Sequence, residues 1–300
     1  MEFHQLRDFL AVAATGSFSK AAKKCHVAQP SLSKAIQRLE DEFGEKLFVR
    51  LKRQAVLTPA GEIVQRRATR ILNEVEQAKR DLEDARGLRR GKVNIGILPT
   101  ISPYFLPRVL AQFTQKFPAL QVVVTEETTV DLLKLVETWE LDLALVSLPI
   151  PDTNLETETL FQEELLLAVP SKHSLAVKPS VSVKDLDGEK FILMKEGHCL
   201  ADQVLTFCHE KDLRLQIVLK TSQIETVHSL VMAGMGISLV PQMARISGRI
   251  PLVYRSLENP KPTRSVTAVW RNGHDHTRAA AEFLNQLRQS AKAFVETLEK

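Results

Sequence analysis

The feature that most constrains the fold is a long stretch with a seven-residue apolar repeat. It opens at Thr58-Pro59, a hydroxyl cap followed by a proline, and extends to about Arg86. Its apolar residues lie alternately four and three positions apart, with charges between them: Val64, Ala68, Ile71, Val75, Ala78, Leu82 and Ala85. This spacing predicts one long helix whose apolar seam pairs with that of a second copy, giving a homodimer. The alternative is an amphipathic helix that lies on its own domain.

The residues before this helix predict a small helical domain. Ser17 is a suitable N-cap, and Pro30 suits the first turn of a helix because its missing N–H costs nothing there. Residues 47–57 predict a short basic β-hairpin. Three segments carry apolar residues at helical spacing: Leu6, Phe9, Leu10 and Ala13; Phe18, Ala21, Ala22 and Cys25; Leu32, Ile36, Leu39 and Phe43. These patterns predict three short helices followed by a hairpin.

The third of these helices carries polar residues opposite its apolar stripe, and the hairpin adds arginines. Residues 1–90 hold 18 Lys/Arg against 12 Asp/Glu, whereas the other 210 residues hold 22 against 24. Positive charge confined to one end is expected where that end meets a polyanion. Any one of these side chains could be a solvated surface residue, but the set predicts contacts with double-stranded DNA. The candidates are Gln29, Ser31, Ser33, Lys34 and Arg38 on the helix, and Arg50 and Arg53 on the hairpin.

The pattern changes after a linker at residues 87–91. Short apolar strands alternate with helical stretches, which predicts an α/β domain with a largely parallel sheet. About 200 residues remain, enough for two lobes with a ligand cleft between them. The strand candidates are Val93–Leu98, Val122–Thr125, Leu141–Ser147, Leu165–Pro170, Phe191–Met194, Ile237–Pro241 and Val266–Arg271.

Several motifs resemble those of LysR-type transcriptional regulators. They are Ser17-Phe18-Ser19-Lys20-Ala21-Ala22, Gln29-Pro30-Ser31-Leu32-Ser33, Leu39-Glu40, Leu47-Phe48, Leu57-Thr58-Pro59-Ala60-Gly61 and Ala233-Gly234-Met235-Gly236-Ile237. The resemblance spans nearly the whole chain. It implies a winged helix-turn-helix over residues 1–58, a dimerising linker helix over 59–90 and a two-lobed, periplasmic-binding-protein-like effector domain over 91–300. Lobe I would hold residues 91–164 and 266–300, and lobe II residues 165–265. Such regulators act on promoter DNA together with RNA polymerase, usually as homotetramers.

A second set of motifs resembles the OxyR group of hydrogen-peroxide sensors within that family. It comprises Gly197-His198-Cys199-Leu200-Ala201-Asp202-Gln203, Phe207-Cys208, Ile97-Leu98-Pro99-Thr100, Pro103-Tyr104 and Leu106-Pro107. The resemblance implies that Cys199 is the peroxidatic thiol and Cys208 the resolving thiol. Thr100, Thr129 and His198 would surround the peroxide. The stretch Gln216–Glu225 matches only loosely and lacks an imidazole that this group often has there.

The spacing of Cys199 and Cys208 has a geometric consequence of its own. The nine-residue step between them contains no Gly or Pro and predicts a helix. Nine helical residues turn through about 900° and rise roughly 13.5 Å, whereas a disulfide needs Cα atoms within about 7 Å. The two sulfurs can therefore join only if the helix unwinds. A position at the helix N-terminus favours the thiolate of Cys199. The alternative is that both cysteines are packing residues, as Cys25 is expected to be on its apolar face.

Other classes of protein are disfavoured by what the sequence lacks. No apolar run approaches the roughly 20 residues that span a bilayer, and the opening residues do not resemble a signal peptide, so we expect a cytoplasmic protein. The cysteine and histidine spacings predict no metal site, and we expect neither a cofactor nor enzymatic activity. Two alternatives remain. One is a regulator of the same family whose interlobe cleft binds a small organic effector, and the other is a thiol peroxidase, which the absence of a CxxC motif disfavours.

Overall fold

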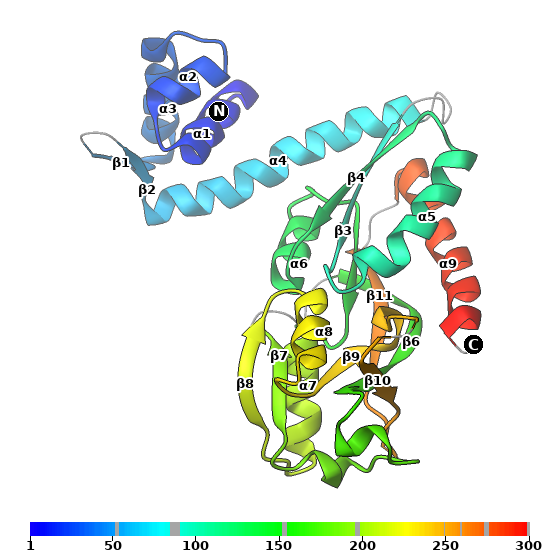
Figure 1. Ribbon diagram of the computed structural model, residues 1–300. Coiled ribbons are helices and arrows are strands. Elements are labelled where there is room, and N and C mark those ends of the chain that lie inside the picture. The colour runs from blue at the N-terminus through cyan, green and yellow to red at the C-terminus, as the bar shows by residue number, and fades with distance from the viewer. Residues whose placement is uncertain are drawn as a thin grey trace. The chain divides into compact units, whose positions relative to one another are not determined.

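The structure is a computed structural model that describes residues 1–51, 54–84, 91–151, 155–195, 199–248, 250–258, 260–272 and 276–298. It divides into two compact units, one of Met1–Glu83 with Thr138–Glu140 and one of Asp84–Glu137 with Leu141–Lys300 (Figure 1). In the described part of the chain no helix is long and apolar enough to cross a membrane. The finer domain and lobe bounds given above stay predictions.

The first unit has the predicted helices and hairpin. Its elements are α1 (Phe3–Thr15), α2 (Phe18–Lys24), α3 (Gln29–Phe43), the antiparallel pair β1 (Phe48–Arg50) and β2 (Ala55–Leu57), and α4 (Pro59–Asp84). Ser17 caps α2 by accepting a hydrogen bond from Lys20 N at 3.4 Å. A core that includes Phe9, Leu32 and Ile36 joins the three short helices. The helices and hairpin predicted from local periodicity are thereby confirmed, and with them the winged helix-turn-helix that the family resemblance implies.

Two close contacts fix the hairpin against the helices. The carboxylate of the buried Glu40 accepts hydrogen bonds from Leu47 N at 2.9 Å and Phe48 N at 3.4 Å, and it pairs with Lys46 Nζ at 2.9 Å. At the start of α4, a Cβ on Gly61 would lie 2.2 Å from Leu47 O. Only glycine therefore allows α4 to begin so close to the hairpin.

The apolar seam of α4 divides into two parts. Val64 and Ala68 pack against the core of the first unit, as the alternative for this helix expected. Further along, Ile71 and Ala78 are exposed and Val75 is half-buried. These later positions are available to a second copy, and the homodimer stays a prediction.

The second unit contains a seven-stranded mixed sheet in the order β10-β6-β11-β5-β3-β4, with β9 also paired to β6. Its strands are β3 (Gly91–Ile97), β4 (Leu120–Glu126), β5 (Leu143–Ser147), β6 (Leu155–Pro170), β9 (Ser238–Pro241), β10 (Leu252–Arg255) and β11 (Thr263–Arg271). A separate parallel pair holds β7 (Lys190–Met194) and β8 (Gln216–Thr221). The helices are α5 (Ser102–Lys116), α6 (Thr129–Glu137), α7 (Cys199–Glu210), α8 (Ile224–Met232) and α9 (Arg278–Leu298), with 3-10 turns at Ser174–Ala176, Val183–Leu186 and Gln242–Ala244.

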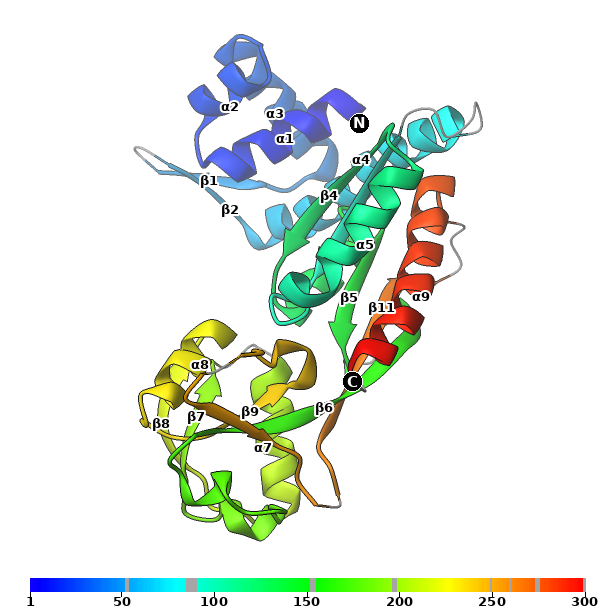
Figure 2. The same ribbon diagram turned by 45° about the vertical axis from the view of Figure 1, so that its right-hand side comes forward.

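The prediction of a largely parallel sheet was wrong. β3 is parallel to β4 and β5, but β11 is antiparallel to both β5 and β6, and β9 and β10 are antiparallel to β6. The reason is that the chain crosses this unit along β6 and returns along β11 in the opposite direction, as Figure 2 shows. These two long strands connect two apolar clusters.

The two clusters form the core of the second unit. One is built mainly from β3, β5, α5 and α9, where Phe113 and Phe283 pack edge to face with ring centroids 4.9 Å apart. The other is built mainly from the second half of β6 with β7, α7, α8 and β9. The strand β6 contributes side chains to both clusters and is paired with β11, so the side chains of these two strands include those that lie between the two clusters.

Candidate functional site

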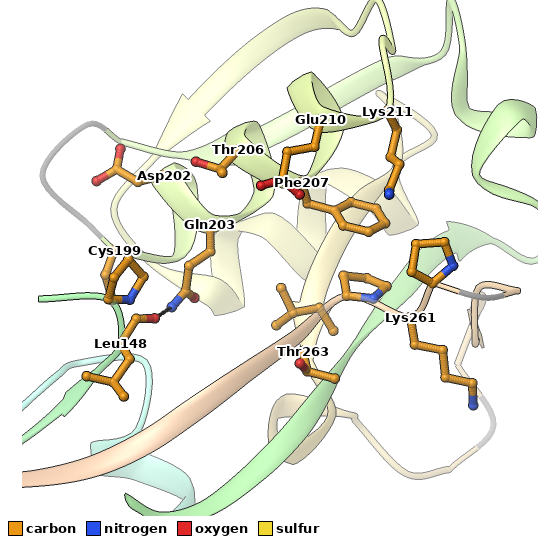
Figure 3. A pocket seen from close by; sticks show the side chains of 14 residues that line it. Leu148, Cys199, Asp202, Gln203, Thr206, Phe207, Glu210, Lys211, Lys261 and Thr263 are labelled. Atoms are coloured by element: carbon orange, nitrogen blue, oxygen red, sulfur yellow. Dashed lines mark hydrogen bonds between the residues drawn. The ribbon is translucent and has the colours of Figure 1, made fainter.

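Cys199 is the first residue of α7, at the edge of a cavity of about 500 Å³ (Figure 3). Its thiol is free and partly buried, and the residue packs against the first apolar cluster. Asp202, Gln203 and Thr206 of the same helix also line the cavity. His198, predicted to lie beside the peroxide, is outside the described residues.

A buried ion pair lies close to this thiol. Arg264 of β11 and Glu163 of β6 are cross-strand neighbours, and Arg264 Nε donates to Glu163 Oε1 at 2.7 Å. Both side chains are fully buried. The second carboxylate oxygen of Glu163 accepts a hydrogen bond from Met243 N at 2.8 Å. The guanidinium is therefore held in one orientation.

Arg264 fixes Thr100, the first of the predicted peroxide ligands. Arg264 Nη1 donates to Thr100 Oγ1 at 2.9 Å and Nη2 donates to Thr100 O at 3.0 Å. The Thr100 hydroxyl accepts this bond, so its own proton is available for donation to another group. No sequence motif pointed to Arg264 as a site residue. The signal that could have identified it is an arginine two residues before the apolar strand candidate Val266–Arg271.

Thr129, the second predicted ligand, is brought to the same place as the first residue of α6. Its hydroxyl is buried and has no hydrogen-bond partner of standard geometry among the described residues. Its interaction is with the Cys199 thiol, whose pKa it lowers. The structure thus gathers Thr100, Thr129 and Cys199 around Arg264, and leaves the Thr129 hydroxyl able to bond a small polar molecule.

Burial opposes the stabilisation of the Cys199 thiolate that its position at the helix N-terminus predicts. Burial raises the pKa of the Cys199 thiol above its ordinary value. Arg264, the Thr129 hydroxyl and the Leu200 N–H each lower that pKa, whereas the nearby Asp202 carboxylate raises it. Desolvation outweighs the groups that favour the anion, because the sulfur lies inside the protein rather than at an exposed helix end.

Cys208 lies at the opposite side of α7, in the second apolar cluster. It is 2% exposed, and burial raises the pKa of its thiol to about 11. The helix is continuous from Cys199 to Glu210 and both cysteines are free thiols. The predicted helix between them is confirmed, and at roughly 1.5 Å of rise per residue it keeps the two sulfurs far apart.

The candidate DNA-binding residues lie along α3. Gln29, Ser31, Lys34 and Arg38 are exposed, and Ser33 is half-buried. The side chain of Arg50 and the whole of Arg53 fall outside the described part of the chain. Cys25, expected to be a buried packing residue, is instead half-buried at the end of α2, where burial and its hydrogen bond with Asp8 raise the pKa of its thiol. No group of three or more His, Cys, Asp or Glu among the described residues could hold a metal ion.

Known proteins resemble the chain over its whole length. Residues 3–62 match the family of bacterial regulatory helix-turn-helix proteins of the LysR type, and residues 86–292 match the LysR substrate binding domain. The DNA-binding transcriptional dual regulator OxyR of Escherichia coli is 34% identical over 91% of this chain and 90% of its own. The structure of a full-length OxyR variant from Pseudomonas aeruginosa matches with a TM-score of 0.76 at 30% identity, over 96% of this chain and 98% of its own. Full-length CbnR complexed with its target DNA matches with a TM-score of 0.72 at 25% identity, over 97% of this chain and 100% of its own.

Proposed function

The chain belongs to the LysR family of DNA-binding transcriptional regulators, and we propose that it senses hydrogen peroxide by oxidation of Cys199 and formation of a Cys199–Cys208 disulfide. The observation that carries this proposal is the placement of the Cys199 thiol beside Arg264 and the buried Thr129 hydroxyl. The full-length likeness to peroxide-responsive regulators supports it.

In the first step the sulfur of Cys199 attacks one oxygen of hydrogen peroxide and the O–O bond breaks. The product is a sulfenic acid, and the leaving hydroxide takes the thiol proton to become water. Arg264 and Thr129 stabilise the sulfur as it becomes anionic, and the Thr100 hydroxyl can donate a hydrogen bond to the departing oxygen while keeping its own proton. His198 would be a further donor to the peroxide.

In the second step the thiol of Cys208 attacks the oxidised sulfur of Cys199. A disulfide forms and the sulfenic hydroxyl leaves as water, so one peroxide is reduced to two waters overall. Because α7 separates the two sulfurs, its turns must unwind for the bond to form. The residues of α7 that leave the second cluster include Leu200, Ala201 and Val204, so the oxidised effector domain must pack differently.

Transcriptional control would depend on DNA binding by the first unit. We infer that α3 enters the major groove with Gln29, Ser31, Ser33, Lys34 and Arg38, and that the hairpin brings Arg50 and Arg53 to the DNA backbone. Repacking of the effector domain would change how the DNA-binding units of a homodimer or homotetramer meet the promoter and RNA polymerase. Oxidation at one sulfur thereby alters DNA occupancy at a distance.

Peptide mapping after peroxide treatment tests the proposal. The reduced full-length protein is mixed with equimolar hydrogen peroxide, alkylated and analysed by mass spectrometry. We expect a Cys199–Cys208 linked peptide in the wild type, and sulfenic acid at Cys199 without that link in Cys208→Ser. A Cys199 that stays reduced would refute the peroxide function. Thermal stabilisation by small organic acids, with no response to peroxide, would identify the family's other kind of sensor, which binds an organic effector.

A further inference from the structure

A glutamine in the middle of the redox segment fastens α7 to a neighbouring strand. Gln203 Nε2 donates hydrogen bonds to Ser147 Oγ at 2.8 Å and to Leu148 O at 2.6 Å (Figure 3). Ser147 is fully buried at the end of β5, and that strand belongs to the first apolar cluster. The buried face of α7 belongs to the second cluster. The side chain of Gln203 therefore connects the two clusters at the helix that must unwind.

The chemistry of the partners fixes the orientation of this amide. The Leu148 carbonyl oxygen can only accept, so the group that faces it is the NH₂ end of Gln203. The other end, Oε1, is then buried without a hydrogen-bond partner in the part of the chain that the structure describes. Opening of α7 would give Oε1 access to water, which partly offsets the loss of the two hydrogen bonds. The contact thus holds the helix closed without making it immovable.

We propose that Gln203 is a positioning residue that keeps α7 closed while Cys199 is a thiol, and thereby sets how fast Cys208 reaches the oxidised sulfur. This inference rests on the proposed function. Gln203 lies between the two cysteines, so the turn that carries it must change when the sulfurs approach each other. Breaking its hydrogen bonds to Ser147 and Leu148 is therefore part of the second step, and the first step does not require it.

The surroundings of α7 leave room for this movement. The cavity of about 500 Å³ lies along the side of the helix that bears Gln203, Thr206 and Phe207, and Pro260 and Pro262 line it as well. Side chains on this side of α7 can move into the cavity when the helix opens, without displacing the first cluster. The hydrogen bonds of Gln203 to Ser147 and Leu148 therefore hold α7 in place beside a cavity into which it could otherwise move.

The test separates the two chemical steps by time. Gln203→Leu keeps the size of the side chain and removes both donors. Reduced protein is mixed with peroxide at several concentrations and alkylated at successive times, and mass spectrometry then quantifies sulfenic acid and disulfide. The rate of sulfenic acid formation depends on peroxide concentration, whereas the rate of disulfide formation does not. We expect the variant to form the disulfide about 5- to 30-fold faster, with sulfenic acid formation unchanged.

Two control variants and one further measurement make the result specific to the hydrogen bonds. Thr206→Val changes an exposed residue of the same helix and should leave both rates unchanged. Ser147→Ala should accelerate the second step less than Gln203→Leu does, and add nothing in the Gln203→Leu background, because the two residues share one interaction. Amide hydrogen exchange of α7 in the reduced protein should be faster in Gln203→Leu and unchanged in Thr206→Val.

The possible outcomes distinguish this inference from the function on which it rests. A folded Gln203→Leu variant with unchanged disulfide formation and unchanged exchange in α7 would overturn the role of Gln203. An equal acceleration of both steps would also overturn it, since Gln203 would then act on Cys199 itself. A wild type that forms no Cys199–Cys208 disulfide, with faster α7 exchange in the variant, would refute the redox function and support the restraint.

Discussion

Removal of the buried charges beside Cys199 tests how the thiol is activated. Glu163 and Arg264 have side chains that are 0% exposed. Arg264→Met alone would leave the Glu163 carboxylate buried without a counter-charge, at a cost of about 3–5 kcal/mol. That is a large part of the 5–15 kcal/mol, roughly, that stabilises a folded domain. The informative variant is therefore Glu163→Gln with Arg264→Met, which removes both charges and preserves side-chain volume.

The double variant should react more slowly with peroxide. Arg264 is the strongest of the groups that lower the pKa of Cys199, and its loss leaves only the weaker Thr129 and Leu200 interactions to oppose burial, so that pKa rises further. Thr100 also loses the donor that orients its hydroxyl. One hydrogen bond to a charged group contributes about 1.5–3 kcal/mol. The rate of sulfenic acid formation at neutral pH should therefore fall about 10- to 100-fold, and the midpoint of its pH profile should move to higher pH.

The assay is the rate of Cys199 oxidation across a series of pH values, with circular dichroism to show that the variant is folded. Lys261→Met is the matched control, because Lys261 lines the same cavity but its side chain is 50% exposed and pairs with Glu164 at 3.4 Å. It should leave both the rate and the midpoint unchanged. A folded double variant with the wild-type rate and midpoint would refute the role assigned to Arg264.

Three further predictions concern stability and DNA binding. Gly61→Ala should lower the thermal stability of the first unit by several degrees, because its Cβ would collide with Leu47 O; an unchanged melting curve would contradict the close approach. Burial raises the pKa of Cys208 from 9.0 to about 11, so the stability that the neutral thiol contributes is complete below pH 9 and is lost as the pH rises towards 11. Chemical denaturation should show a loss that is about 2–3 kcal/mol larger in the wild type than in Cys208→Ala, which keeps the other groups whose pKa burial raises. Arg50→Ala should weaken binding to all DNA sequences alike and reduce the slope of log K against log salt by about one, measured by fluorescence anisotropy; a changed base preference at constant slope would argue against a phosphate contact.

Local patterns in the sequence predicted the first unit well, because its helices and hairpin are encoded in short-range periodicity and capping residues. The second unit was harder. The first half of β6, residues 155–164, is rich in Glu and Thr and lacks the apolar run that predicts a buried strand. It is nevertheless paired with β11 in the sheet. β8 and β10 are short strands and were likewise not predicted.

In the candidate site, too, short motifs predicted some residues, whereas contacts between distant parts of the chain could not be predicted. Cys199, Thr100 and Thr129 were identified from their motifs, and the helix from Cys199 to Cys208 followed from the absence of breakers. The link between Arg264 and Glu163 joins residues 101 positions apart, and no local pattern encodes it. The pKa of Cys199 depends on how deeply the fold buries the sulfur, which the position of a helix end does not reveal.

Because Cys208 is buried in the second cluster, oxidation of Cys199 must come before any reaction of Cys208. A sulfur enclosed by hydrocarbon and uncharged at physiological pH is a poor target for dissolved oxidants and a poor attacking group. It becomes competent only after the helix has loosened in response to the first sulfur. A sulfenic acid at Cys199 that a reductant reaches before the helix loosens returns to the thiol, whereas one that persists goes on to the disulfide. The delay before the enclosed sulfur can attack therefore sets a time window between the two outcomes.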